Sequence, residues 1–239
     1  MAKRKIVFVI VEGPSDDEAL GILFSKIYDK NSVYVHIMHG DITTQSGVNS
    51  SNIVSKVGNC VKQYATQNHY KFSDFKEIIH IVDMDGAYIP DSAVVYDSVA
   101  AKPIYSTTEI RSANPTGILN RNKIKRENID RLKSTGLIWK LPYGIYYMSC
   151  NLDHLLYGKL NSSDEEKEDD AYAFAKKYRN DIPGFLEYIG ESDFSVNSEY
   201  KESWKYITEG LHSLERHTNL GVCFQDSIAV NFHNKVQLK

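Results

Sequence analysis

KIVFVIVEGPSD, residues 5–16, is the stretch of sequence that decides the fold. Residues 5–11 are dominated by β-branched and aromatic side chains, which is typical of a strand buried on both faces of a parallel sheet. The strand is expected to end at Glu12, and Ser15 can cap a helix that begins near Asp16. Apolar residues then recur at helical spacing, at Ala19, Leu20, Leu23, Phe24 and Ile27. The stretch therefore predicts a strand, a tight turn and a helix in succession.

The same alternation continues along the chain. Further strands are predicted at 33–38 and 77–82, with a helix at 52–67 between them, and this order favours a parallel α/β sheet. Later elements are a short strand at 104–105, a basic helix at 118–132, a strand at 144–149, a helix opened by Asn151, and a mainly helical region from 172 to about 214. We expect an α/β catalytic domain over residues 1–160 and a helical C-terminal extension, 161–239, that packs on it.

Composition limits the class of protein. The chain has 239 residues, 42% of them hydrophobic, and a formal net charge of -3, so it can bury a substantial core and is not a strongly basic nucleic-acid-binding domain as a whole. Cys60, Cys150 and Cys223 are far apart and odd in number, which predicts neither a disulfide framework nor a zinc site. The apolar run at 6–11 is too short to span a bilayer. We expect a cytoplasmic protein with no membrane partner.

Acidic residues follow two of the predicted strands. Glu12 comes directly after the first strand, and Asp83 and Asp85 come directly after the strand at 77–82. The carboxyl ends of parallel strands lie at one edge of a sheet, so three carboxylates are expected to converge there. Alternation along extended backbone would turn Asp83 and Asp85 to the same side. Hard oxygen ligands of this kind suit Mg²⁺, with Mn²⁺ as an alternative, and a divalent ion would allow all three carboxylates to stay ionised.

Two motifs resemble a known family. V-E-G-P-S-D at 11–16 together with I-V-D-M-D-G at 81–86 is similar to the Toprim domain, and the direct match covers about residues 5–90. The resemblance implies a Rossmann-like parallel sheet flanked by helices, with magnesium held by Glu12, Asp83 and Asp85. The separation between the two motifs is wider than a minimal Toprim domain needs, which suggests an insertion around 43–51.

A third segment, Y-Y-M-S-C-N-L-D-H-L-L at 146–156, resembles stand-alone Toprim nucleases of the abortive-infection type. This resemblance implies that Asp153 and Lys159 complete the catalytic site, with Asp16 as a further metal-binding acid. The alternative is structural: an asparagine that caps a helix, followed by a solvent-facing acid and lysine. Nearby, His154 is a candidate general acid, whereas His80, inside a predicted strand, is better explained as a core histidine.

Basic residues are concentrated in the helix at 118–132. Arg121, Lys123, Lys125 and Arg126 could follow the phosphate backbone of a nucleic acid. The alternative is that they form an ordinary solvated helix face.

The hypothesis that combines these patterns is a Mg²⁺-dependent nuclease that hydrolyses phosphodiester bonds in RNA or DNA, in phage defence or RNA processing. The resemblance implies a separately encoded ATPase as a regulator, and a homodimer suits a nuclease of this size. Two alternatives stay open. One is a non-catalytic module that binds nucleic acid or a partner, and the other is a phosphoryl-transfer enzyme that acts on a small molecule, since a carboxylate site does not by itself specify a polymer.

Overall fold

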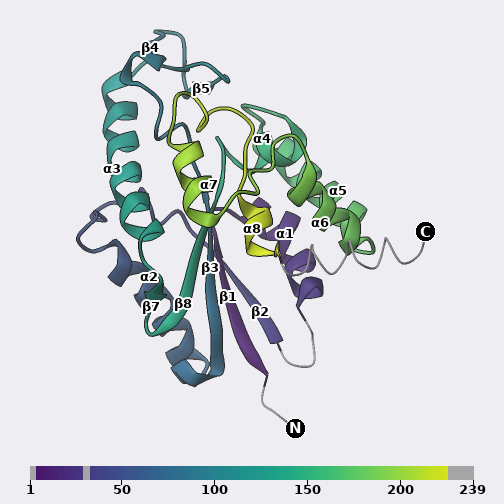
Figure 1. Cartoon of the computed structure of the whole chain (residues 1–239). Coiled ribbons are helices and arrows are strands. Elements are labelled where there is room, and N and C mark those ends of the chain that lie inside the picture. The colour runs from purple at the N-terminus through teal and green to yellow at the C-terminus, as the bar shows by residue number, and fades with distance from the viewer. Residues whose placement is uncertain (1–3, 29–32, 226–239) are drawn as a thin grey trace.

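A five-stranded, mostly parallel sheet forms the centre of the molecule (Figure 1), in a computed structural model that describes residues 4–28 and 33–225. The strand order is β2-β1-β3-β8-β7. The first four strands in this order run parallel to one another, and only β7 is antiparallel to its neighbour β8. Their bounds are β1 Lys5–Val11, β2 Val33–His39, β3 Phe75–Asp83, β7 Leu137–Ile138 and β8 Leu141–Met148. The predicted α/β class is confirmed.

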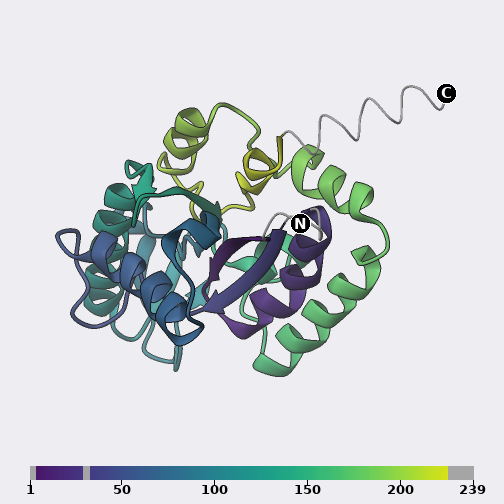
Figure 2. The ribbon, with the colours of Figure 1, turned by 90° about the horizontal axis from the view of Figure 1, so that it is seen from below.

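Helices cover both faces of this sheet. The α-helices are α1 Pro14–Ile27, α2 Ile53–Gln67, α3 Pro115–Lys133, α4 Leu152–Tyr157, α5 Asp164–Tyr178, α6 Ile182–Glu191, α7 Tyr200–Ile207 and α8 Leu220–Cys223, with short 3-10 helices η1 Phe72–Asp74 and η2 Asp91–Ala93. In Figure 2 the sheet lies between α2 and α3 on one side and α1, α5 and α6 on the other. This arrangement explains why the central strands are apolar at nearly every position.

Alternate residues of β1 belong to two separate parts of the core. Phe8 and Ile10 pack in a cluster that includes side chains of α2, α3 and α7. Val7 and Val9 pack in the opposite cluster, which includes side chains of α1, α4, α5, α6 and α8. The strand is thus buried on both faces, as its composition predicts.

A second, smaller sheet lies between β3 and α3 in the sequence. It has the order β4-β6-β5, with β4 Val94–Tyr96, β5 Ile104–Tyr105 and β6 Ile110–Ser112. Figure 1 shows β4 and β5 beyond the carboxyl ends of the main strands. Residues 40–52, which include the insertion expected around 43–51, form an irregular connection that buries Ile42 and Val48 in the core.

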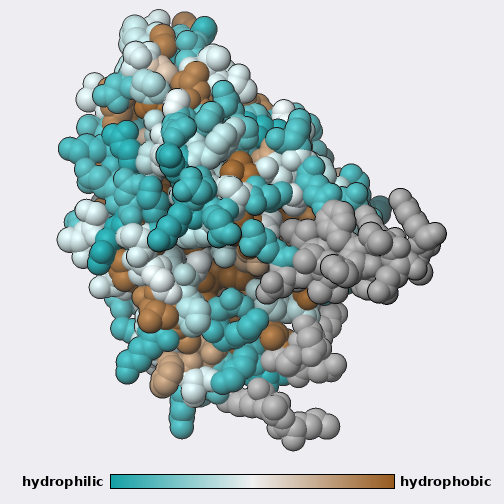
Figure 3. Space-filling model, viewed as in Figure 1, coloured by the Kyte–Doolittle hydropathy of each residue, from teal (hydrophilic) through white to brown (hydrophobic). Residues whose placement is uncertain are grey.

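The described residues from 161 to 225 are mainly helical, and within them the buried side chains of α5, α6 and α8 join the core of the sheet. Phe174 of α5 and Phe185 of α6 belong to the same cluster as Val9 of β1 and Leu20 of α1. Among the described residues, no helix is long and apolar enough to cross a membrane. Figure 3 shows a mainly hydrophilic face, with hydrophobic side chains gathered in a recess over the central strands just below α7 and α8.

Candidate functional site

The first two acidic positions meet at the carboxyl edge of the sheet. Glu12 follows β1, Asp83 is the last residue of β3, and these two strands are parallel neighbours. The backbone N–H of Asp83 donates a hydrogen bond of 3.1 Å to Glu12 Oε1. The sequence prediction that these two segments converge is therefore confirmed by the geometry.

A cleft of about 470 Å³ opens at this edge. Its walls come from the ends of β1, β2 and β3 and from α1, α4 and α5. Seven carboxylate side chains line it: Glu12, Asp16, Asp41, Asp83, Asp153, Asp164 and Glu168. Lys167 is the one basic side chain among the described residues that line it. The cleft is thus strongly acidic, and a bound cation would be favoured there.

Asp16 organises the turn between β1 and α1. Its Oδ2 accepts hydrogen bonds from the backbone N–H groups of Glu12, at 3.1 Å, and of Gly13, at 2.9 Å. The carboxylate therefore caps the amino end of α1 and also fixes the backbone that carries Glu12. Burial raises the pKa of Asp16 to about 6, although these two hydrogen bonds favour the charged form.

Asp85 is placed differently from Asp83. β3 ends at Asp83, and the backbone then turns, with φ of 48° at Asp85 and 68° at Gly86. The Asp85 N–H donates to the carbonyl of Cys150, at 2.7 Å. Asp85 is not among the residues that line the cleft. The expected alternation of Asp83 and Asp85 fails because the chain is no longer extended at Asp85.

Lys125 is the partner of Asp85. Its side chain is 0% exposed, and Nζ lies 2.5 Å from Asp85 Oδ2 and 3.2 Å from Glu12 Oε1. Burial alone would lower the pKa of Lys125, but the carboxylates of Asp85 and Glu12 outweigh it and hold the pKa above its ordinary value. Lys125 is therefore a buried cation next to the cleft, and not the surface contact to nucleic acid that the sequence suggested.

The other three basic residues of the run, Arg121, Lys123 and Arg126, differ in how far they are exposed to solvent. Arg121 is half-buried, and it donates hydrogen bonds to the Asp85 carbonyl, at 2.7 Å, and to the Tyr105 hydroxyl. Lys123 is exposed and Arg126 is half-buried. The run thus combines a buried structural face with an outer face, so it does not form a single basic surface.

Burial and mutual repulsion disfavour the charged forms of Glu12 and Asp83 in the cleft. Burial raises the pKa of Glu12 to about 8, the attraction of Lys125 opposes this, and the charges of Asp41 and Asp85 add to it. Burial also raises the pKa of Asp83 well above its ordinary value, and the charges of Glu12 and Asp16 raise it further. A divalent cation would relieve this repulsion and favour the ionised forms.

The donor chemistry of the cleft fits Mg²⁺ or Mn²⁺. Carboxylate oxygens are the ligands these hard ions prefer, and the Oδ1 atom of Asp153 is buried without a hydrogen-bond partner. Within residues 4–28 and 33–225, however, no three His, Cys, Asp or Glu side chains are already arranged to hold a metal ion. Binding would therefore require rotations of the side chains that line the cleft.

Of the two residues after β8 that were expected in the site, Asp153 lines the cleft and Lys159 does not. Asn151 caps α4, because its Oδ1 accepts the N–H of His154 at 2.9 Å. Asp153 is buried and lines the cleft, so it is not the solvent-facing acid of the structural alternative. Lys159 does face solvent, where its Nζ lies 2.6 Å from Asp170 Oδ2, and it does not line the cleft.

Four charged residues that line the cleft, Asp41, Asp164, Lys167 and Glu168, were not predicted as site residues. Asp41 lies just beyond β2, the third parallel strand that ends at this edge, so the rule that identifies Glu12 and Asp83 would also have found it. Lys167 lies on α5, with Nζ 3.7 Å from Asp153 Oδ2. No local pattern marks Lys167, because its position depends on how α5 packs against α1 and α4.

The two candidate histidines lie in the core. His80 is buried in β3, with Nδ1 2.9 Å from the Tyr143 hydroxyl, as expected for a core histidine. His154 is also buried, and burial lowers its pKa to about 4. His154 does not line the cleft, so the geometry gives it no position from which to act as a general acid there.

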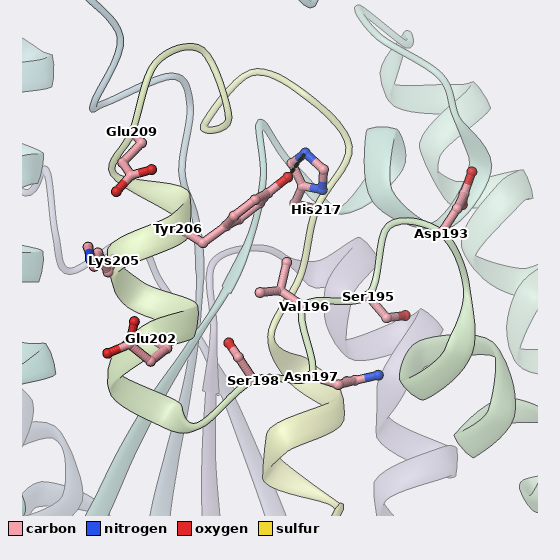
Figure 4. Close-up of a pocket in the computed structure, with 10 residues that line it drawn as sticks. All are labelled: Asp193, Ser195, Val196, Asn197, Ser198, Glu202, Lys205, Tyr206, Glu209 and His217. Carbon is pink, nitrogen blue, oxygen red and sulfur yellow. Dashed lines mark hydrogen bonds between the residues drawn. The ribbon is translucent and has the colours of Figure 1, made fainter.

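A second hollow, of about 520 Å³, lies between α7 and the segment 193–198 (Figure 4). The Tyr206 hydroxyl and His217 Nε2 are 3.1 Å apart at one end of it, and Glu202 of α7 and Glu209, just after α7, line it. None of the acids that follow β1, β2 or β3 contributes to this hollow. The acidic cleft is therefore the stronger candidate for a site of chemistry.

No family model matches this sequence, and no curated protein or solved structure matches it either.

Proposed function

We propose that this chain is a Mg²⁺- or Mn²⁺-dependent nuclease of the Toprim type that hydrolyses phosphodiester bonds in RNA or DNA. The observation that carries the proposal is the placement of Glu12 and Asp83 at the ends of neighbouring parallel strands, in one cleft with three further buried or half-buried acids. Clefts of this kind at the carboxyl edge of an open α/β sheet are where such proteins bind ligands.

Glu12 and Asp83 are the residues that would hold the ion, with Asp153 and Asp16 as additional oxygen donors beside them. When bound, the ion would neutralise charge on the phosphoryl group and activate a water molecule. Asp16 keeps the Glu12 backbone in place through its two hydrogen bonds. Lys167 lines the cleft and could neutralise a phosphate oxygen there, whereas Lys159, the lysine that the resemblance included in the site, pairs with Asp170 outside the cleft.

The biological setting and partners in this proposal come from the resemblance of the motifs. They are phage defence by abortive infection or RNA processing, and a separately encoded ATPase that restrains the nuclease. A homodimeric assembly is proposed from the size of the chain. The substrate would approach past exposed cations outside the acidic cleft, and Lys123 is one such group on α3.

One observation favours a second candidate function. The cleft is lined by seven carboxylates and, among the described residues, a single lysine, so it offers little attraction to a polyanion before a metal ion is bound. A phosphoryl-transfer enzyme that acts on a small phosphate ester would need fewer cationic contacts. Substrate size is thus the property that distinguishes the two functions.

The test is cleavage of pooled cellular RNA and plasmid DNA with Mg²⁺ or Mn²⁺, against EDTA. The variants are Glu12→Gln and Asp83→Asn, and Glu191→Gln on the exposed end of α6 is the matched control. Metal-dependent products that both site variants abolish and the control retains would support the nuclease. If folded protein cleaves neither polymer but releases phosphate from small esters, the second function replaces the first.

A further inference from the structure

A positive charge is already built into the acidic site. Lys125 projects from the middle of α3 and its ammonium group lies between Glu12 and Asp85, at 3.2 Å and 2.5 Å. The side chain has no exposed surface. Breaking either ion pair without a replacement would leave a buried charge uncompensated, which is strongly unfavourable.

The surroundings hold Lys125 and Asp85 in this arrangement. Asn122, one turn before Lys125 on α3, donates from Nδ2 to the Gly86 carbonyl at 3.3 Å. Arg121 donates to the Asp85 carbonyl, and Asp85 N–H donates to the carbonyl of Cys150. The bend at 85–86 is thus bonded to α3 and to the segment after β8, so Asp85 is not free to turn into the cleft while these contacts last.

Asp83 and Asp85 consequently lie in different environments. Asp83 lines the open cleft, whereas Asp85 does not and is neutralised by Lys125. Glu12 lies between the two environments, because Asp83 N–H and Lys125 Nζ both contact its Oε1 atom, at 3.1 Å and 3.2 Å.

We infer that Lys125 takes the place of a second metal ion, so that the site binds one divalent cation, on the Asp83 side of Glu12. This inference rests on the proposed metal-dependent function and specifies the composition of its site. Lys125, held by its ion pairs with Glu12 and Asp85, supplies a fixed positive charge next to the metal ion. Asp85 positions Lys125 and is not a metal ligand.

The test is the number of Mn²⁺ ions bound per chain. The metal-free full-length protein is titrated with Mn²⁺, with free ion followed by electron paramagnetic resonance and heats by calorimetry. The decisive variants are Asp83→Asn and Asp85→Asn, which remove the same charge two residues apart, and Glu191→Gln is the control. Lys125→Met is added, with far-ultraviolet circular dichroism to check that each variant is folded.

The wild type is expected to bind one ion. Asp83→Asn should weaken binding by about 100-fold, since a charged ligand is lost, and Asp85→Asn should retain one ion with affinity changed by less than about 10-fold. Lys125→Met, where it folds, should bind two ions because the position between Glu12 and Asp85 becomes vacant. Two ions on the wild type, or loss of binding in Asp85→Asn, would overturn the inference and leave the nuclease proposal intact. No bound ion on the wild type would overturn both.

Discussion

At the scale of single residues, the pairing of buried charges fixes the positions of the side chains beside the cleft. Lys125, Glu12 and Asp85 form a compact ionic group in which the lysine is fully buried. Such groups contribute little net stability when complete, but they are costly to break because the remaining partner keeps its charge without compensation. The stability of the folded chain should therefore be sensitive to any one of these side chains.

Lys125→Met is expected to lower the free energy of unfolding by about 3–5 kcal/mol in the absence of divalent ions, because it leaves Glu12 and Asp85 unpaired. Urea denaturation in EDTA measures this change. Lys123→Met, on the exposed side of the same helix, is the matched control and should change stability by less than about 0.5 kcal/mol. Equal effects of the two substitutions would show that Lys125 is not paired as described.

His80 gives a pH-dependent contribution to stability. Burial lowers its pKa from 6.5 to about 3. Between these values the unfolded chain binds a proton that the folded chain excludes, so this contribution is complete above pH 6.5 and is lost as the pH falls. The free energy of unfolding of the wild type, relative to His80→Gln, should fall by about 1.4 kcal/mol per pH unit in this window. The exposed His39→Gln variant is the control, and a pH-independent difference would contradict the assignment.

The site residues that could be predicted from the sequence are those that depend only on strand ends. Glu12 and Asp83 were found because each directly follows a recognisable apolar strand. Asp85 was misplaced because the left-handed backbone after β3 depends on hydrogen bonds from residues more than 60 positions away. Lys125 was assigned to the surface because a basic helix does not reveal which of its cations turns inward to meet a carboxylate from another element.

At the scale of elements, the bend that follows β3 connects the main sheet to the smaller one. A Cβ atom at Gly86 would lie 2.7 Å from Leu214 Cδ2 and 3.0 Å from Ile110 Cδ1, and the residue has a positive φ of 68°. Only glycine combines this conformation with so close an approach.

Gly86→Ala should consequently lower the free energy of unfolding by about 1–3 kcal/mol, through both backbone strain and overpacking. Thermal denaturation followed by circular dichroism measures it. Gly136→Ala serves as the control, because no atom lies within 4 Å of a Cβ there, and its effect should be small.

Helix α5 places Lys167 in the wall of the cleft. If the proposed function is correct, Lys167→Ala should lower kcat/KM by about 100-fold with little change in stability, as expected when one group that neutralises transition-state charge is lost. Lys159→Ala should leave kcat/KM nearly unchanged, since Lys159 pairs with Asp170 outside the cleft. Steady-state cleavage rates at fixed metal concentration separate the two. The reverse order of effects would restore the role suggested by the motif resemblance.

The regular elements were largely predictable because their apolar periodicity is strong. The strands at 33–38 and 77–82 and the helix at 52–67 match β2, β3 and α2 closely. The small sheet β4-β6-β5 was mostly missed, since strands of two or three residues carry too little periodicity to be recognised.

At the scale of the whole molecule, the helical region after residue 160 completes the core of the α/β domain. A chain that ends at Leu160 would lack Phe174, Phe185 and Ile189, which belong to the same buried cluster as Val9 and Leu20. We expect such a shortened chain to lose cooperative unfolding, as measured by differential scanning calorimetry. A sharp transition near the wild-type temperature would show that residues 1–160 fold independently.

The hydrogen bonds of Ser213 also have a consequence for the order of events during protein synthesis. Its carbonyl accepts the N–H groups of both Gly86 and Cys150, so the bend that holds Asp85 is completed by a residue that is synthesised after β3, α3 and β8. While that residue has not yet left the ribosome, Asp85 and Lys125 lack part of the framework that positions them. For the proposed nuclease, which would meet the messenger and ribosomal RNA of its own translation, this order of synthesis delays an intact site until residue 213 has been made and released.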